Sequence, residues 1–189
     1  MTRSELASHP ERAVSMMLAA LQADGPHPDY ADELSLFGQF VGSWAIDNTY
    51  FTESGPKRHE AEWRFGWTLD GRAVQDVLFH PPASKAAATR SYSEGIGTTV
   101  RLFEPATADW TVIWFGATRG NVVSLCGRPD GDDIEIVGES RRGDSLRWRF
   151  LEITDDSFHW HGLIRPRDGG EWRLRATVTA GEVTFTPTR

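Results

Sequence analysis

The segment EWRFGWTLDGRAVQDV, from Glu62 to Val77, predicts two antiparallel strands joined by a two-residue Asp-Gly turn. An Asp-Gly pair between alternating apolar residues favours a type I′ turn, whose twist matches that of two paired strands. Leu69 and Arg72 then flank the turn, and counting outward from them fixes which residues face each other. On one face of the hairpin, the expected cross-strand pairs are Trp67 with Val74, Phe65 with Asp76, and Trp63 with Leu78.

This face of the hairpin is far more aromatic than the other face, so we expect it to point into the protein. A slip of one residue in the register would move every ring to the solvent side. Asp76 is therefore expected to point inward, opposite Phe65. An isolated ionised carboxylate in such a place is strongly unfavourable, so Asp76 must be paired, hydrated or protonated.

Three interpretations of an inward Asp76 follow from its chemistry. It pairs with an inward Arg, His or Tyr and holds the strands together, or it anchors a hydroxyl, amine or amide of a ligand. The third interpretation is an acid or base in an aromatic pocket, where burial tunes a carboxylate for proton transfer. Asn48 and Tyr50 share a face with Trp44 on an earlier strand, so either could hydrogen-bond Asp76.

The chain from Ser43 onward repeats the pattern of short strands and turns. Turn residues recur every 8 to 12 residues or so, a spacing that predicts an antiparallel meander. Closure is favoured because a barrel leaves no exposed strand edge. We therefore expect an all-β protein: a single antiparallel up-and-down β-barrel of about 8–10 strands. The predicted strands are 43–52, 58–69, 72–79, 97–103, 110–115, 121–127, 133–139, 145–153, 158–165 and 171–179, with a short tail strand at 182–186.

The N-terminal part of the barrel protein is expected to be helical. Ser8 and Glu11 have the spacing of a capping box at the start of a helix over 8–24. We expect the apolar stripe of this helix to cover its own domain, and the alternative is a partner chain, as in a homodimer. The stripe consists of Val14, Met17, Leu18 and Leu21.

Length and composition limit the domain count and the partners. The 189 residues suit one barrel domain over residues 36–189, preceded by a helical extension over residues 1–35 with a further helical turn over 32–40. The formal net charge of −7 argues against binding to nucleic acid or to an anionic membrane surface. The sequence contains no apolar run long enough to cross a bilayer and no secretory signal, so we expect a cytoplasmic protein.

The segment FGQFVGSW, residues 37–44, places a Gly-Ser-Trp motif between a helical turn and the first strand. In this position the motif resembles the start of a calycin-type barrel, the superfamily of lipocalins, fatty-acid-binding proteins and nitrobindin-like haem proteins. The segments LDGRAVQDV, FEPATADWTVIW and SLRWRFLEITDDSFHWHG are similar to segments of bacterial lipocalin-like domains. The likeness covers residues 36–180, most of the chain.

This resemblance implies a barrel that encloses a cavity. In lipocalins, the residue equivalent to Trp44 closes one end of the barrel and is covered by an arginine of the last strand. The resemblance implies Arg173 or Arg175 for that role. Haem-type barrels usually carry G-x-W-x-G-x-G, but AIDN follows Trp44 in this chain, so the resemblance does not imply a haem pocket.

The segment FHWHG places His159 and His161 on one face of a strand. A three-residue turn at 154–156 would group the aromatic residues of two strands on one face and the arginines and histidines on the other. Such patterning directs both histidines to solvent. No carboxylate follows at the spacing of a metal-binding cupin motif, so we expect no metal.

These observations support three functional hypotheses. The first is binding of a small hydrophobic or aromatic molecule in an aromatic-lined cavity, with Asp76 as its polar anchor. The second is a cofactor-free isomerase, cyclase or lyase that uses Asp76 as acid or base, and the third is a haem protein with His159 or His161 as axial ligand. We expect no cofactor. The candidate ligand-binding residues are Tyr50, Trp63, Phe65, Trp67, Asp76, Trp114, Trp148 and Trp160.

Two further expectations concern the rim of the barrel. His80 lies on the same strand face as Asp76, at the far end of that strand, and is expected to be solvated. The small, polar segment over 81–95 is expected to form a disordered connection, and the alternative is a mobile loop near the barrel mouth.

Overall fold

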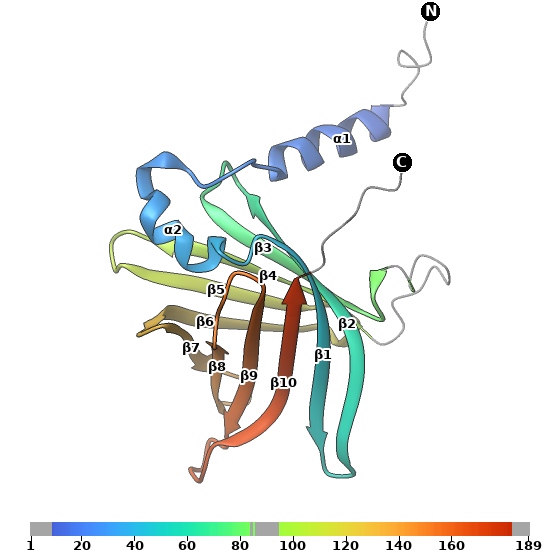
Figure 1. Cartoon of the computed structure of the whole chain (residues 1–189), viewed down its shortest axis with the longest axis vertical. Helices are drawn as coiled ribbons and strands as arrows, with labels where there is room; N and C mark the ends of the chain where they lie inside the picture. Colours follow the sequence, from blue (N-terminus) through green and yellow to red (C-terminus); the bar gives the residue numbers. More distant parts are fainter. Residues whose placement is uncertain (1–8, 84, 86–94, 183–189) are drawn as a thin grey trace, which may run out of the picture.

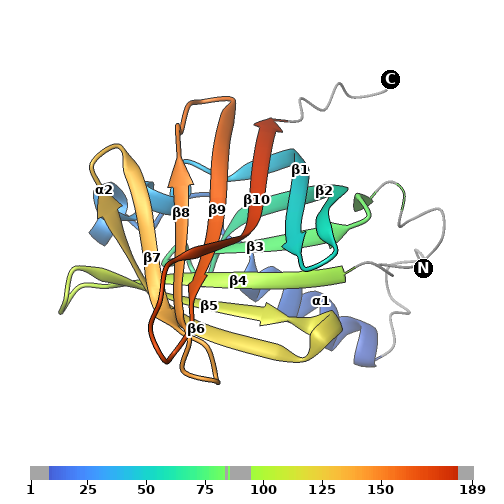
Figure 2. The same ribbon diagram turned by 90° about the horizontal axis from the view of Figure 1, so that it is seen from below.

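The computed structural model describes residues 9–83, 85 and 95–182 of the chain. In this part of the chain, ten antiparallel strands follow one another around a closed barrel, and β10 lies beside β1 (Figures 1 and 2). The prediction of an all-β up-and-down barrel is confirmed. The strands are β1 (Gly42–Thr52), β2 (Gly55–Thr68), β3 (Ala73–His80), β4 (Gly95–Glu104), β5 (Asp109–Gly116), β6 (Asn121–Asp130), β7 (Asp133–Glu139), β8 (Ser145–Leu151), β9 (Ser157–Arg165) and β10 (Arg173–Glu182).

The hairpin of β2 and β3 has the register expected from its sequence. Phe65 lies opposite Asp76, Trp63 opposite Leu78, and every pair between them agrees with that register. Trp63, Phe65 and Asp76 are buried. The aromatic face of the hairpin is therefore the interior face, as predicted.

The turn between these strands is the expected Asp-Gly turn. Asp70 and Gly71 have φ angles of 60° and 72°, and the Arg72 N–H donates to the Leu69 carbonyl at 3.2 Å. The turn packs against residues 25–27, and a Cβ on residue 71 would lie 2.2 Å from the Gly25 carbonyl oxygen. Both the backbone angle and this close approach require glycine at position 71.

The short helix α2 (Ala31–Gly38), which follows the 3₁₀ turn η2 (Pro28–Tyr30), lies across one end of the barrel (Figure 1). Its Phe37 is fully buried and meets the Trp110 ring edge-on, with 4.9 Å between centroids. Phe40 follows the helix and packs on Phe150 at 4.6 Å. This end of the barrel is therefore filled by aromatic side chains.

Trp44 is buried at this closed end, but no arginine of the last strand covers it. Its indole N–H donates to the Phe40 carbonyl at 2.8 Å. Because β10 runs antiparallel to β1, Trp44 lies opposite Glu182, whereas Arg173 and Arg175 lie at the other end of β10 and are exposed. The expectation that Arg173 or Arg175 covers Trp44 is therefore wrong.

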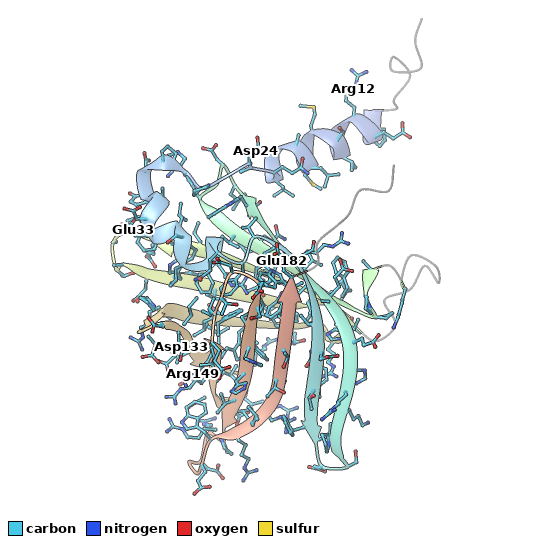
Figure 3. The ribbon with its side chains drawn as sticks, in the orientation of Figure 1. Arg12, Asp24, Glu33, Asp133, Arg149 and Glu182 are labelled. Atoms are coloured by element: carbon cyan, nitrogen blue, oxygen red, sulfur yellow. The ribbon has the colours of Figure 1, made fainter. Side chains whose placement is uncertain are left out.

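The predicted N-terminal helix exists, but its apolar stripe does not cover the barrel. Helix α1 (His9–Leu21) projects away from the strands, and Arg12 marks its outer part (Figures 1 and 3). Val14, Met17 and Leu18 are each more than half exposed. The expectation of an intramolecular cover is wrong for the described residues, because the breaker-rich segment after α1 carries the helix away from the sheet. Ser8, the expected cap, lies outside the described residues.

The predicted tail strand and the predicted loop over 81–95 lie partly outside the described residues. Strand β10 continues through Gly181 to Glu182, so the predicted break before a tail strand is wrong, and the remainder of that strand lies outside the described residues. Most of the predicted loop over 81–95 also lies outside them.

Candidate functional site

A cavity of about 640 Å³ opens at the end of the barrel opposite α2. Strands β1, β3 and β5 end at this cavity, and β2, β4 and β6 begin there, because neighbouring strands are antiparallel. We call it the mouth cavity. Its lining residues are Tyr50, Thr52, Lys57, His59, Leu78, His80, Gly95, Ile96, Gly97, Trp114, Gly116, Thr118, Arg119 and Asn121.

A short chain of hydrogen-bonding groups forms part of the cavity wall. The Asn48 side-chain amide donates to the Tyr50 hydroxyl at 3.2 Å, and this hydroxyl lies 3.4 Å from Nε2 of His80. The ring of His59 lies next to both, 5.9 Å from the Tyr50 ring and 6.4 Å from the His80 ring. Tyr50 and the two histidines thus bring three hydrogen-bonding rings together at the cavity.

His80 is 5 % exposed, so the expectation that it is solvated at the rim is wrong. The rings of Tyr50 and His59 cover it from β1 and β2, strands that are distant from His80 in the sequence. The sequence did indicate that His80 points inward, because His80 lies four residues after Asp76 on β3 and therefore on the same face of the strand. The pattern of β3 alone could not predict its burial, because the rings that cover His80 belong to other strands.

Burial raises the pKa of Tyr50 above its usual value of 10.0. The hydrogen bond from Asn48 and the positive charge of Arg119 act in the opposite direction but are smaller effects. Tyr50 is therefore a neutral phenol at physiological pH. Since it accepts a hydrogen bond from Asn48, it keeps its own proton to donate to His80 or to a bound molecule.

Trp114 lines the mouth cavity with its indole ring, which lies close to Gly97 on the neighbouring strand β4. A Cβ on residue 97 would fall 2.1 Å from Cη2 of the Trp114 ring, so only glycine at position 97 allows this position of the ring. Leu78 and Ile96 add aliphatic surface. These side chains from β3, β4 and β5 form an apolar part of the wall, and the polar rings lie beside it on β1, β2 and the end of β3.

Asp76 belongs to a different site, deeper in the barrel. It is 0 % exposed and forms an ion pair with Arg101, with 2.6 Å between Oδ2 and Nη1. Its Oδ1 accepts the Thr99 N–H at 3.0 Å. The guanidinium of Arg101 lies over the rings of Phe37 and Phe65, 5.2 Å from each centroid. This is the arrangement of the first interpretation, in which Asp76 pairs with an inward arginine.

Arg101 is the residue that the sequence-based site lacked. Its signal was available, since Thr99, Arg101 and Phe103 alternate on β4 and the pairing of β4 with β3 puts Thr99 opposite Asp76. Asn48 and Tyr50 do not hydrogen-bond Asp76, because β2 lies between β1 and β3. That expectation is wrong.

Neither a protein-family model nor a curated protein sequence matches this chain. The chain is similar in structure to an S-type phycobiliprotein lyase from Guillardia theta. The TM-score is 0.53 and the sequence identity 11 %, over 80 % of this chain and 93 % of that one. At this identity the likeness concerns the fold alone, and it agrees with the closed antiparallel barrel.

The eight candidate ligand-binding residues divide between the mouth cavity and the packed interior. Of them, only Tyr50 and Trp114 are among the described residues that line the mouth cavity. Trp63 and Phe65 belong to the buried core, and Trp67 lies against Gly38 of α2. Trp148 and Trp160 are half-buried and pack edge-on, 5.7 Å apart. The remaining candidate is Asp76, in its ion pair.

His159 and His161 lie on the outer face of the barrel, as the patterning of the two strands predicted. Trp160 pairs with Phe150 on the inner face, while His161 pairs with Arg149 on the outer face. Arg149 in turn lies 3.0 Å from Asp133 on the outside of β7 and β8 (Figure 3). Burial, the neighbouring His159 and the charge of Arg149 lower the pKa of His161. Neither histidine is placed to serve as an axial ligand in the interior.

Metal binding and membrane spanning each require a feature that is recognisable in the described residues. These residues contain no group of three or more His, Cys, Asp or Glu side chains arranged to hold a metal ion. Among the described helices, none combines the length and apolar character needed to span a membrane.

Proposed function

We propose that the barrel binds a small molecule with an apolar or aromatic body in the mouth cavity. The observation that carries this proposal is the cavity itself, which is about 640 Å³ in volume and combines the Trp114 surface with the polar groups of Tyr50 and His80. Small-molecule sites commonly measure about 300–1,000 Å³ and pair an apolar lining with a few convergent polar groups.

The deeper interior is a less suitable place for a ligand. The rings of Phe37, Phe40, Phe150 and Phe158 contact one another across it, with centroid distances of 4.6 to 6.3 Å among the contacting pairs. Both carboxylate oxygens of Asp76 already face protein partners. In this proposal, the polar anchor of the ligand is therefore Tyr50 with His80, and Asp76 holds the strands beneath the cavity.

An enzymatic function is the second candidate, and one contact favours it. The Tyr50 hydroxyl lies 3.4 Å from His80 Nε2, so a small approach of the two rings would bring them within the distance of about 2.6–3.2 Å at which a phenol and an imidazole exchange a proton. One solved structure of similar fold is that of a phycobiliprotein lyase, but a shared fold does not determine chemistry. An enzyme would convert the bound molecule, and Tyr50→Phe would reduce turnover much more than binding.

Titration with N-phenyl-1-naphthylamine, a neutral aromatic dye that fluoresces in apolar surroundings, tests the proposed binding. Asn121 lines the mouth cavity, so the larger side chain of Asn121→Trp should fill part of it. We expect this variant to bind the dye about tenfold more weakly than the wild type does. Val122 is the next residue and is 49 % exposed, so Val122→Trp is the matched control and should bind like the wild type. Equal binding by both variants would contradict the proposal.

A further inference from the structure

The charge of the mouth cavity differs from that of the whole protein. The chain has a formal net charge of −7. Yet the described lining residues include two permanent cations, Lys57 and Arg119, together with two histidines, and no Asp or Glu. A cavity that is lined by charges of one sign attracts ions of the opposite sign and raises their local concentration.

The two cations belong to different elements of the cavity wall. Lys57 is on β2, whereas Arg119 is in the 3₁₀ turn η3 (Ala117–Arg119), which follows β5, so β3 and β4 lie between them. The turn η3 is fixed to β4, because the Thr118 hydroxyl accepts the Ile96 N–H at 2.8 Å. Arg119 is therefore held near the opening rather than on a free tail.

Both cations also lack an acidic partner within the described part of the chain. Other arginines of the barrel pair with carboxylates, for example Arg147 with Glu135 at 3.0 Å and Arg149 with Asp133 at 3.0 Å. No described Asp or Glu forms an ion pair with Lys57 or Arg119. Two unpaired cations that face one cavity can both contact a single anionic group.

We infer that the ligand of the mouth cavity carries a carboxylate or a similar compact anion, which binds between Lys57 and Arg119. The Tyr50 hydroxyl donates a hydrogen bond to the same group, while the apolar body of the ligand packs on Trp114 and Leu78. This inference rests on the proposed function and adds the chemical class of the ligand. A neutral phenol suits the role, because a tyrosinate would repel an anion.

A pair of probes that differ in charge but hardly in shape tests the inference. These are 2-naphthoate, an aromatic carboxylate, and 2-naphthamide, its neutral analogue, and calorimetric titration measures both affinities. The wild type should bind 2-naphthoate about tenfold more tightly than 2-naphthamide, as expected for contacts with exposed cations.

The double variant Lys57→Gln/Arg119→Gln should remove this preference, because it should weaken the binding of 2-naphthoate much more than that of 2-naphthamide. The control double variant is Arg12→Gln/Arg128→Gln, which lowers the net charge by the same amount. Arg12 lies on α1, and Arg128 lies on β6 at 3.9 Å from Glu135, so neither lines the mouth cavity. The control should keep the wild-type preference.

The outcomes separate failure of the inference from failure of the proposed function. Equal wild-type affinities for the two probes would overturn the inference but leave small-molecule binding intact. The inference is also overturned if the control variant loses the preference for 2-naphthoate as much as the Lys57→Gln/Arg119→Gln variant does. If neither probe binds and Asn121→Trp has no effect on the neutral dye, the proposed function fails, and the inference fails with it.

Discussion

Asp76 and Arg101 form an ion pair inside the barrel, with 2.6 Å between Oδ2 and Nη1 and with both side chains almost completely buried. The pair lies between the mouth cavity and the end of the barrel that α2 and its aromatic neighbours fill. Within the described residues, Nε of Arg101 has no hydrogen-bond partner, and aromatic rings cover the guanidinium instead. Burying two charges gains little over an apolar pair, but removing one of them leaves the other uncompensated.

Asp76→Asn is therefore expected to lower the free energy of unfolding by about 3–5 kcal/mol, because Arg101 would stay buried without its counter-charge. The double variant Asp76→Asn/Arg101→Met should recover much of this loss, since it removes both charges. Urea unfolding of the two variants and the wild type measures the effect. A fully stable Asp76→Asn protein that no longer binds the neutral dye would instead restore Asp76 as the ligand anchor.

The turn between β2 and β3 gives a prediction about local geometry. Gly71→Ala combines a positive φ angle with a Cβ that would lie 2.2 Å from the Gly25 carbonyl oxygen, so we expect a loss of at least about 2 kcal/mol. Gly131 has a similar φ of 65° but open space around it, so Gly131→Ala should cost only about 1 kcal/mol. Thermal unfolding compares the two. Equal losses would mean that the contact with Gly25 contributes nothing.

The two helices are expected to contribute very differently to stability. Phe37→Ala in α2 should cost about 3–5 kcal/mol, because it opens a cavity among Trp110, Phe150 and Arg101. Removal of residues 1–21, which include α1, should change the unfolding free energy by less than about 0.5 kcal/mol, because the α1 side chains are exposed. A large loss on removal of α1 would show that its apolar stripe has a partner within the chain.

The raised pKa of Tyr50 predicts a particular response to alkaline pH. Since the fold favours the protonated phenol, the stabilisation from Tyr50 is complete below pH 10 and is lost as the pH rises from 10 towards the folded-state pKa. Tyr50→Phe should therefore lose less stability than the wild type over this range. Denaturant unfolding at a series of alkaline pH values measures the difference. Parallel curves for the two proteins would contradict the shift.

Much of the fold could be predicted because local patterns determine it. The Asp-Gly turn and the alternation of aromatic residues gave the register of β2 with β3, and the same alternation separated Trp160 from His161 on β9. The packing of α1 could not be predicted, because an amphipathic helix has the same sequence pattern whether or not its apolar face has a partner.

The site was harder to predict than the barrel, because it depends on which strand ends meet. Asp76 was correctly placed inside, but its partner Arg101 comes from the next strand, and the register of β3 with β4 is needed to find it. The mouth cavity collects residues from strand ends that are far apart in the sequence, such as Tyr50 and Trp114. Their shared location follows from the closed barrel rather than from any motif.

The most direct test of the proposed site follows the tryptophan indole N–H signals in two-dimensional NMR spectra while N-phenyl-1-naphthylamine is added. The Trp114 signal, assigned with a Trp114→Phe variant, should shift progressively and saturate, because Trp114 lines the mouth cavity. The signals of Trp44 and Trp110, which are buried near the closed end, should stay in place. Saturable shifts at Trp44 or Trp110 with none at Trp114 would contradict binding in the mouth cavity.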